Sequence, residues 1–238
     1  MQSTKLSHSK EQPKVQDNMA KDIIIIDWRK KMALPSIKNQ GTAECCWAIS
    51  SADAVASCKA LRGTSVTLSP QHLIDVAYIN HKVNGSFQVS WAMDFIRDSG
   101  ITLEECYPFK GHPHFDKTKI PEFQNLYTVE NWGLIRYDND KISEMLKQGP
   151  MVITAHYDKG LRKLDANSIY RPNYELEGDE DYGHAMLLVG EGVRLIGKDK
   201  IHLWIVQNSW GENWAENGFG KIVRNYELKV RGYYPILQ

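Results

Sequence analysis

Three residues far apart in the sequence, Cys46, His184 and Asn208, carry side chains that could together perform nucleophilic catalysis. A cysteine thiolate is a strong nucleophile, and a neighbouring imidazole can take the thiol proton as the sulfur attacks. An amide oxygen can accept a hydrogen bond from one imidazole nitrogen and so direct the other nitrogen toward the sulfur. These side chains are therefore suited to acyl transfer through a covalent thioester.

The predicted secondary structure would bring these residues together. Cys46 opens a predicted helix, because small and apolar residues recur at three- and four-residue steps along residues 48–60 before Gly63. The unpaired N–H groups and the dipole of a helix start favour a thiolate, so we expect a lowered pKa for Cys46. His184 begins an apolar strand at residues 185–189, and Asn208 follows a strand at residues 201–206. We expect these strands to pair and to place His184 beside Asn208.

The remaining elements divide into a helix-rich first half and a strand-rich second half. Ser69 followed by Pro70 is typical of a helix start, and another apolar stripe begins at Val89 and stops at Gly100. Beyond residue 122 we expect a short helix from residue 139 or 140 and a strand at residues 151–155. Ligand sites favour the cleft between two such lobes.

The chain resembles the papain-like cysteine peptidases, the family that includes plant papain and animal cathepsins. Cys46 precedes a tryptophan, and the histidine and asparagine lie far downstream, as in that family. The similarity covers residues 23 to about 225. Its other motifs occur in family order: Asp27-Trp28-Arg29, Gln40, residues 68–73 (LSPQHL), Asn84-Gly85, Gly149-Pro150, residues 169–172 (IYRP), and residues 208–211 (NSWG) with Trp214, Glu216, Asn217 and Gly218.

The resemblance implies an α+β fold in which a helical lobe and an antiparallel β-barrel-like lobe hold the active site in the cleft between them. We expect a flexible polar tail over residues 1–22, the helical lobe over residues 23–122 and the β-rich lobe over residues 123–238. The implied activity is that of a cysteine-type endopeptidase, which hydrolyses peptide bonds through an acyl-enzyme thioester without a cofactor or metal. The implied partners are peptide or protein substrates and protein inhibitors, and we expect a monomer.

The resemblance also assigns roles to individual residues. Cys46 would attack, His184 would move the proton, and Asn208 would orient the imidazole. The side-chain amide of Gln40 and the backbone N–H of Cys46 would bind the developing oxyanion. We expect the substrate to be contacted by Glu44, Cys45, Asn84, Gly85, Ser86, Phe87, Gly183 and Trp210, of which Trp210 would also shield the His184–Asn208 pair from water.

Several residues near the nucleophile depart from the family pattern. Ala43 and Glu44 replace a cysteine and a glycine, and Ser86 replaces the second glycine of the substrate loop. Glu44 would slow turnover and favour lysine or arginine before the cut, with an apolar side chain one step upstream against Phe87. The family's disulfide cysteines are also replaced, by Ala43, Val76 and Val83, so we expect free thiols at Cys45, Cys46, Cys58 and Cys106.

Two other interpretations remain. The first is a catalytically weak or silent homologue that binds peptides or an inhibitor through the cleft. Glu44, Ser86 and the lack of the family's propeptide in this sequence favour it, whereas the intact triad and Gln40 favour activity. The second interpretation is a metal site at Cys106, His112 and His114. It is the weaker one, because a His-Pro-His loop lacks the usual spacing of metal ligands.

Charge and hydropathy exclude other classes of protein. Lys plus Arg and Asp plus Glu number 29 each, so no overall positive charge favours nucleic acid. Apolar runs such as residues 23–26 and 185–189 are far shorter than the roughly 20 residues that span a bilayer. Residues 1–21 lack the apolar segment of a secretory signal, which favours the cytosol for the chain as given. The lysosome, vacuole or extracellular space is the family's usual location for a processed form.

Overall fold

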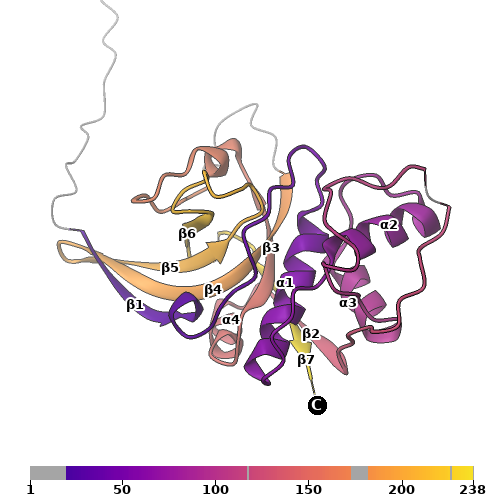
Figure 1. Ribbon diagram of the computed structural model, residues 1–238. Helices are drawn as coiled ribbons and strands as arrows, with labels where there is room; N and C mark the ends of the chain where they lie inside the picture. Colours follow the sequence, from indigo (N-terminus) through magenta and orange to yellow (C-terminus); the bar gives the residue numbers. More distant parts are fainter. Residues whose placement is uncertain (1–19, 117, 173–181, 226, 238) are drawn as a thin grey trace, which may run out of the picture.

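The computed structural model describes residues 20–116, 118–172, 182–225 and 227–237 of the chain (Figure 1). Helices gather in one lobe and antiparallel strands in the other, which confirms the predicted α+β fold with two lobes. The helical lobe contains α1 (Cys46–Leu61), α2 (Pro70–His81) and α3 (Val89–Asp98). Beside the sheet lie α4 (Asn139–Leu146) and the 3-10 helices η1 (Trp28–Lys30) and η2 (Lys159–Lys163).

The second lobe is built on one antiparallel sheet with the strand order β2-β7-β3-β4-β5-β6, and β1 pairs with β4 off this path. Its strands are β1 (Lys21–Asp27), β2 (Asn131–Arg136), β3 (Met151–Tyr157), β4 (Tyr182–Ile196), β5 (Asp199–Gln207), β6 (Phe219–Val223) and β7 (Arg231–Ile236). The long strand β4 pairs first with β3 and then with β1 on one edge, and with β5 on the other. The expected pairing of the strands that carry His184 and precede Asn208 is therefore confirmed.

Helix α1 crosses between the lobes and contacts β4, α2 and α3. Every residue from Cys46 to Ser57 is buried, so the helix has no solvent-facing side over this length. Small side chains allow this close packing, and the hydroxyls of Ser50 and Ser51 donate to carbonyl oxygens one turn earlier, at 2.8 and 2.7 Å. The packing fixes the position of Cys46 at the start of the helix.

The helix starts and stops follow local chemistry. The Ser69 side chain accepts a hydrogen bond from the His72 backbone N–H at 3.1 Å, and Pro70 is the first residue of α2, as predicted. Asp138 caps α4 in the same way, through the N–H of Lys141 at 3.0 Å, so the helix begins at Asn139.

Strand β1 differs from the expected division of the chain. Residues 23–27 were placed in the helical lobe, whereas β1 pairs with β4 and belongs to the sheet. Gly190 permits this contact, since a Cβ there would lie 2.5 Å from the carbonyl oxygen of Ile26. The predicted tail over residues 1–22 lies mostly outside the described residues, and its last two residues are part of β1.

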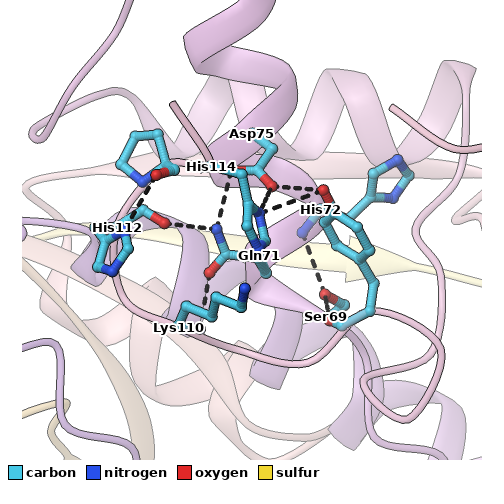
Figure 2. A network of polar contacts seen from close by, with 9 residues as sticks. Ser69, Gln71, His72, Asp75, Lys110, His112 and His114 are labelled. Atoms are coloured by element: carbon cyan, nitrogen blue, oxygen red, sulfur yellow. Dashed lines mark hydrogen bonds and ion pairs between the residues drawn. The ribbon is translucent and has the colours of Figure 1, made fainter. Parts of the chain in front are cut away.

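A buried polar network joins α2 to the segment 107–114 (Figure 2). The carboxylate of Asp75 accepts hydrogen bonds from the Tyr107 hydroxyl at 2.6 Å and from Gln71 and the His114 backbone at 2.9 Å, and it also contacts the His114 ring. Gln71 in turn donates to the His112 carbonyl at 2.7 Å. This segment is therefore held to the helical lobe by side-chain hydrogen bonds.

The four cysteines are free thiols, as expected, so hydrogen bonds rather than disulfides hold these segments together. In the described part of the chain, no group of three or more side chains is placed to ligate a metal. His114 contacts Asp75, and Cys106 is exposed, so the proposed metal site at residues 106–114 gains no support. No helix of the described residues is long and apolar enough to cross a membrane.

Candidate active site

Cys46 and His184 face a cleft of about 850 Å³ between the lobes. Cys46 is the first residue of α1, and His184 lies near the start of β4. The backbone amide of Ala185, the residue after His184, hydrogen bonds to the Cys46 thiol. The sulfur therefore lies beside the strand that carries the imidazole.

His184 is oriented by Asn208, its predicted partner. The His184 Nε2 and Asn208 Oδ1 atoms are 2.7 Å apart, and the Ser209 backbone N–H also donates to Oδ1, at 2.8 Å. An amide oxygen only accepts hydrogen bonds, so Nε2 must carry the hydrogen in this contact. The neutral imidazole consequently holds its lone pair on Nδ1, which makes this the basic nitrogen.

Trp210 covers the imidazole. The Trp210 ring stacks on His184 with centroids 4.6 Å apart and an interplanar angle of 21°. Trp214 packs edge-on against the Trp210 ring, with centroids 5.6 Å apart. The guanidinium of Arg162 lies 4.9 Å from the Trp210 ring. The imidazole is thus buried, in contact with an indole on one face and with Asn208 at its edge.

Burial controls the protonation of both reactive groups. It lowers the pKa of His184 to about 4, and the nearby Arg162 cation acts in the same direction. Burial also raises the pKa of the Cys46 thiol, and the Glu44 carboxylate raises it further. The expected lowering of the Cys46 pKa is wrong, because burial outweighs the backbone N–H groups that stabilise the thiolate.

Gln40 is fixed to the segment that follows Asn208. Its side-chain oxygen accepts a hydrogen bond from the Ser209 hydroxyl at 2.5 Å, and its backbone N–H donates to the Ser209 carbonyl at 2.8 Å. This arrangement uses the oxygen of the Gln40 amide and leaves its NH₂ group as a donor for another partner. Ser209 belongs to the sequence motif of residues 208–211, and its hydroxyl holds the Gln40 side chain in place.

The residues expected to bind substrate occupy different places. Ser86, Phe87 and Gly183 line the cleft. Phe87 packs edge-on against Trp47, with ring centroids 5.6 Å apart. Trp47 also donates a hydrogen bond to the Gly85 carbonyl at 2.9 Å, which ties the loop to α1.

The other expected substrate residues lie at or beyond the cleft edge. Glu44 is exposed and adopts a positive φ of 51°, with its carboxylate 3.3 Å from the position of a Cβ on Gly85. The Cys45 thiol is buried and contacts the Gly111 carbonyl, and burial raises its pKa to about 12. Asn84 is exposed and does not line the cleft.

The structure adds cleft residues that the sequence did not predict. They come from β2, β3 and β7 and include Trp132, Leu134, Arg136, Thr154, Arg231 and Tyr233. Strands β2 and β7 were not predicted, so nothing in the sequence pointed to their side chains, and Thr154 lies on a predicted strand to which no role in the cleft was assigned.

Comparisons with known proteins show which family the chain belongs to. The sequence model described as papain family cysteine protease matches residues 25–235. A cathepsin L-like protein of Caenorhabditis elegans is 34% identical over 227 residues, which are 89% of this chain and 64% of that protein. Cathepsin L of Sarcophaga peregrina is 32% identical over 209 residues, covering 84% of this chain and 58% of that protein. The chain therefore spans less than two thirds of the length of either relative.

Solved structures show the same fold. The bromelain protease from Ananas comosus, in complex with the E64 inhibitor, is 25% identical and has a TM-score of 0.70, covering 90% of this chain and 98% of that one. A cysteine protease from Carica candamarcensis in complex with E-64 gives the same identity, TM-score and coverage. With most of its length matched by the family model, the chain belongs to the papain family of cysteine proteases.

Proposed function

We propose that the chain is a cysteine endopeptidase in which Cys46, His184 and Asn208 act together. The observation that carries the proposal is the 2.7 Å contact between His184 Nε2 and Asn208 Oδ1, beside a cleft that the Cys46 thiol also lines. Because Nε2 carries the hydrogen in this contact, Nδ1 is the basic nitrogen of the imidazole. The cleft is large enough for several residues of an extended peptide.

The proposed reaction begins with a neutral pair. Since burial raises the pKa of Cys46 and lowers that of His184, the proton rests on sulfur before substrate binds. As the sulfur bonds to the substrate carbonyl carbon, His184 Nδ1 takes the thiol proton. The imidazolium then donates that proton to the leaving nitrogen as the C–N bond breaks, and a thioester remains on Cys46.

Hydrolysis of the thioester reverses these roles. His184 accepts a proton from water as the water oxygen attacks the thioester carbon, and the same proton returns to the Cys46 sulfur as the S–C bond breaks. The products are a carboxylic acid and the free thiol. Asn208 holds the imidazole in one orientation through both steps, and Trp210 keeps water from the hydrogen bond between them.

The developing oxyanion would be bound by two donors, the NH₂ group of Gln40 and the backbone N–H of Cys46. The hydrogen bond from Ser209 to Gln40 Oε1 favours this use of the amide. Loss of one such donor costs roughly 2.7–4 kcal/mol of transition-state stabilisation in another protease. Glu44 opposes formation of the thiolate, because its carboxylate raises the pKa of Cys46. We therefore propose a slow peptidase.

A second candidate function is peptide or inhibitor binding without turnover. The observation that favours it is that both burial and Glu44 oppose ionisation of Cys46. The bromelain and Carica proteases bind E64 in their crystals, and we propose that an inhibitor of that kind would enter this cleft. An active peptidase and a silent homologue would both bind such an inhibitor, so binding alone does not separate the two functions.

Cleavage of a fluorogenic peptide library by the purified wild-type protein tests the proposal. Cys46→Ala should abolish turnover and leave peptide affinity nearly unchanged, because the cleft walls stay in place. Cys58→Ala, which alters a thiol outside the cleft, is the matched control and should retain the wild-type rate. If wild-type protein and Glu44→Gly bind peptides but cut none of them, the silent-homologue function replaces this proposal.

A further inference from the structure

The cleft floor contains a row of residues that leads from the nucleophile to two arginines. Ala185 on β4 pairs with Thr154 on β3, Thr154 pairs with Arg231 on β7, and Arg231 pairs with Arg136 on β2. All four residues line the cleft. Residues directly opposite in an antiparallel sheet point to the same face, and neighbouring strands lie about 4.8 Å apart. The Arg231 backbone is therefore about 10 Å from that of Ala185, whose amide hydrogen bonds to Cys46.

Apolar side chains stand beside this row. Trp132 and Leu134 precede Arg136 by steps of two residues on β2, so all three project from one face of the strand. On β7, Tyr233 is likewise two residues from Arg231 and packs against Trp132, with ring centroids 6.1 Å apart. This part of the cleft therefore has an apolar wall next to a cationic end.

The two arginines face each other without a compensating carboxylate. Across the described residues, no carboxylate oxygen forms an ion pair with Arg136 or Arg231, although like charges opposite each other destabilise a strand pair. Lys229 adds a third cation to the cleft lining, and Glu227 is the acidic residue there. The Glu227 carboxylate accepts a hydrogen bond from the Asn225 side chain at 3.1 Å.

Arg231 is held in place by a strained neighbour. Its Nε and Nη2 atoms donate to the Tyr137 hydroxyl at 3.1 and 2.7 Å, and its guanidinium lies 5.4 Å from the Tyr137 ring. Tyr137 has a positive φ of 57°, a conformation that is uncommon and costly for a bulky residue. A neutral hydroxyl orients the guanidinium without neutralising it, which leaves its other N–H groups as donors.

We propose that Arg231 and Arg136 bind the acidic side chain of a peptide substrate, and that a glutamate two positions upstream of the cut fits this part of the cleft. This inference rests on the proposed peptidase function and names a substrate class for it. The methylene groups of glutamate would lie along the apolar wall, and its carboxylate would pair with the guanidinium groups. The sequence predicts an apolar substrate side chain at the same position, packed against Phe87. Such a side chain would leave both arginines without an ion-pair partner.

Peptides that differ at this one position test the proposal. The set consists of four fluorogenic tripeptides that carry Glu, Gln, Leu or Lys two positions upstream of the cut. The other two residues are the same in all four peptides. We expect kcat/KM to be about fivefold higher for Glu than for Gln, the size of an exposed ion pair, with the difference mainly in KM. The preference should weaken as salt is raised from about 0.05 to about 0.5 M, because salt screens exposed charges.

Substitution of the arginines gives a sharper result. Arg231→Gln and Arg136→Gln should each reduce the Glu preference, and Arg231→Glu should reverse it in favour of Lys. Arg97→Gln is the matched control, since Arg97 pairs with Asp94 and Asp98 outside the cleft and should not change the preference. Thermal unfolding of each variant shows whether β7 remains folded, and the reversed Lys preference in Arg231→Glu cannot come from misfolding.

Binding to Cys46→Ala separates this inference from the peptidase function. Fluorescence anisotropy with the labelled Glu and Gln peptides should show the same preference in this variant. Equal affinities, or a preference for Leu, overturn the inference whether or not the wild-type protein cleaves. A Glu preference in binding together with no cleavage by wild-type protein supports the arginine site and contradicts the peptidase function.

Discussion

His184 and Asn208 form a buried pair in which Nε2 of the imidazole lies 2.7 Å from Oδ1 of the amide. His184 lies on β4 and Asn208 directly follows the last residue of β5, and these two strands are neighbours in the sheet. Because the sheet sets the distance between them, the orientation of the imidazole depends on backbone pairing as well as on one hydrogen bond. The geometry is therefore fixed before any substrate binds.

Asn208→Ala should lower kcat by about 100-fold with a small change in KM, since the imidazole loses its orientation and a 1 Å misplacement has effects of this size. Steady-state kinetics with a fluorogenic peptide would measure it. Asn131→Ala, at an exposed amide on β2, is the control and should leave kcat unchanged. A wild-type kcat in Asn208→Ala would show that this hydrogen bond does not support the reaction.

Glu44→Gln should lower the pKa of Cys46, because the carboxylate raises it now. Alkylation by iodoacetamide requires the thiolate, so labelling of Cys46 near pH 7 should become several-fold faster in this variant. Mass spectrometry of the Cys46 peptide gives the rate, with the exposed Cys106 as an internal reference. Glu122→Gln removes an exposed carboxylate and serves as the control. An unchanged rate in Glu44→Gln would mean that Glu44 does not act on the thiol.

Ser209→Ala removes the hydroxyl that donates to Gln40 Oε1. The Gln40 amide should then rotate more freely, and we expect kcat to fall about tenfold while KM stays near its wild-type value. Ser57→Ala is a suitable control, because the Ser57 hydroxyl is buried and has no hydrogen-bond partner among the described residues. If Ser209→Ala raised KM and left kcat unchanged, the residue would belong to substrate binding instead.

His72 gives a prediction about stability and pH. Burial among Phe95, Tyr107 and Phe123 lowers its pKa from 6.5 to about 4. Between these values the unfolded chain holds a proton on His72 that the folded protein lacks, so stability is lost as the pH falls through this range. From about pH 7 to about pH 5 this loss is about 2 kcal/mol.

Urea unfolding of wild-type protein and His72→Phe at both pH values isolates this contribution. The variant keeps an aromatic ring in the cluster and should lose about 2 kcal/mol less than wild type between the two pH values. His202→Phe, at an exposed position on β5, should behave as wild type. Parallel losses in wild type and His72→Phe would show that His72 is protonated equally in the folded and unfolded states.

The sequence predicted the elements whose pattern is local. The Ser69 cap, the start of α1 at Cys46 and the apolar strands β3, β4 and β5 were all predicted, because capping and hydrophobic periodicity are properties of neighbouring residues. Strand β7 was missed, since it is short and contains Gly232 and Pro235, both of which are unusual inside strands.

Properties that depend on packing could not be predicted in this way. The raised pKa of Cys46 arises from burial between two lobes, and a local argument from the helix dipole gave the opposite direction. The row from Ala185 to Arg136 depends on the register of four strands, two of which were not predicted. By contrast, the His184–Asn208 contact followed from two apolar strands and their pairing.

The most direct test of the account is to find the covalent bond that a Cys46 peptidase must form. Wild-type protein is mixed with an excess of a peptidyl epoxide, which alkylates thiolates, and samples are taken for both intact mass and residual peptide cleavage. We predict one adduct per chain, located at Cys46 by peptide mapping, with cleavage lost in proportion to the labelled fraction and no adduct in Cys46→Ala. Cleavage that persists after Cys46 is fully labelled, or an adduct that forms at another residue as cleavage is lost, would contradict the account.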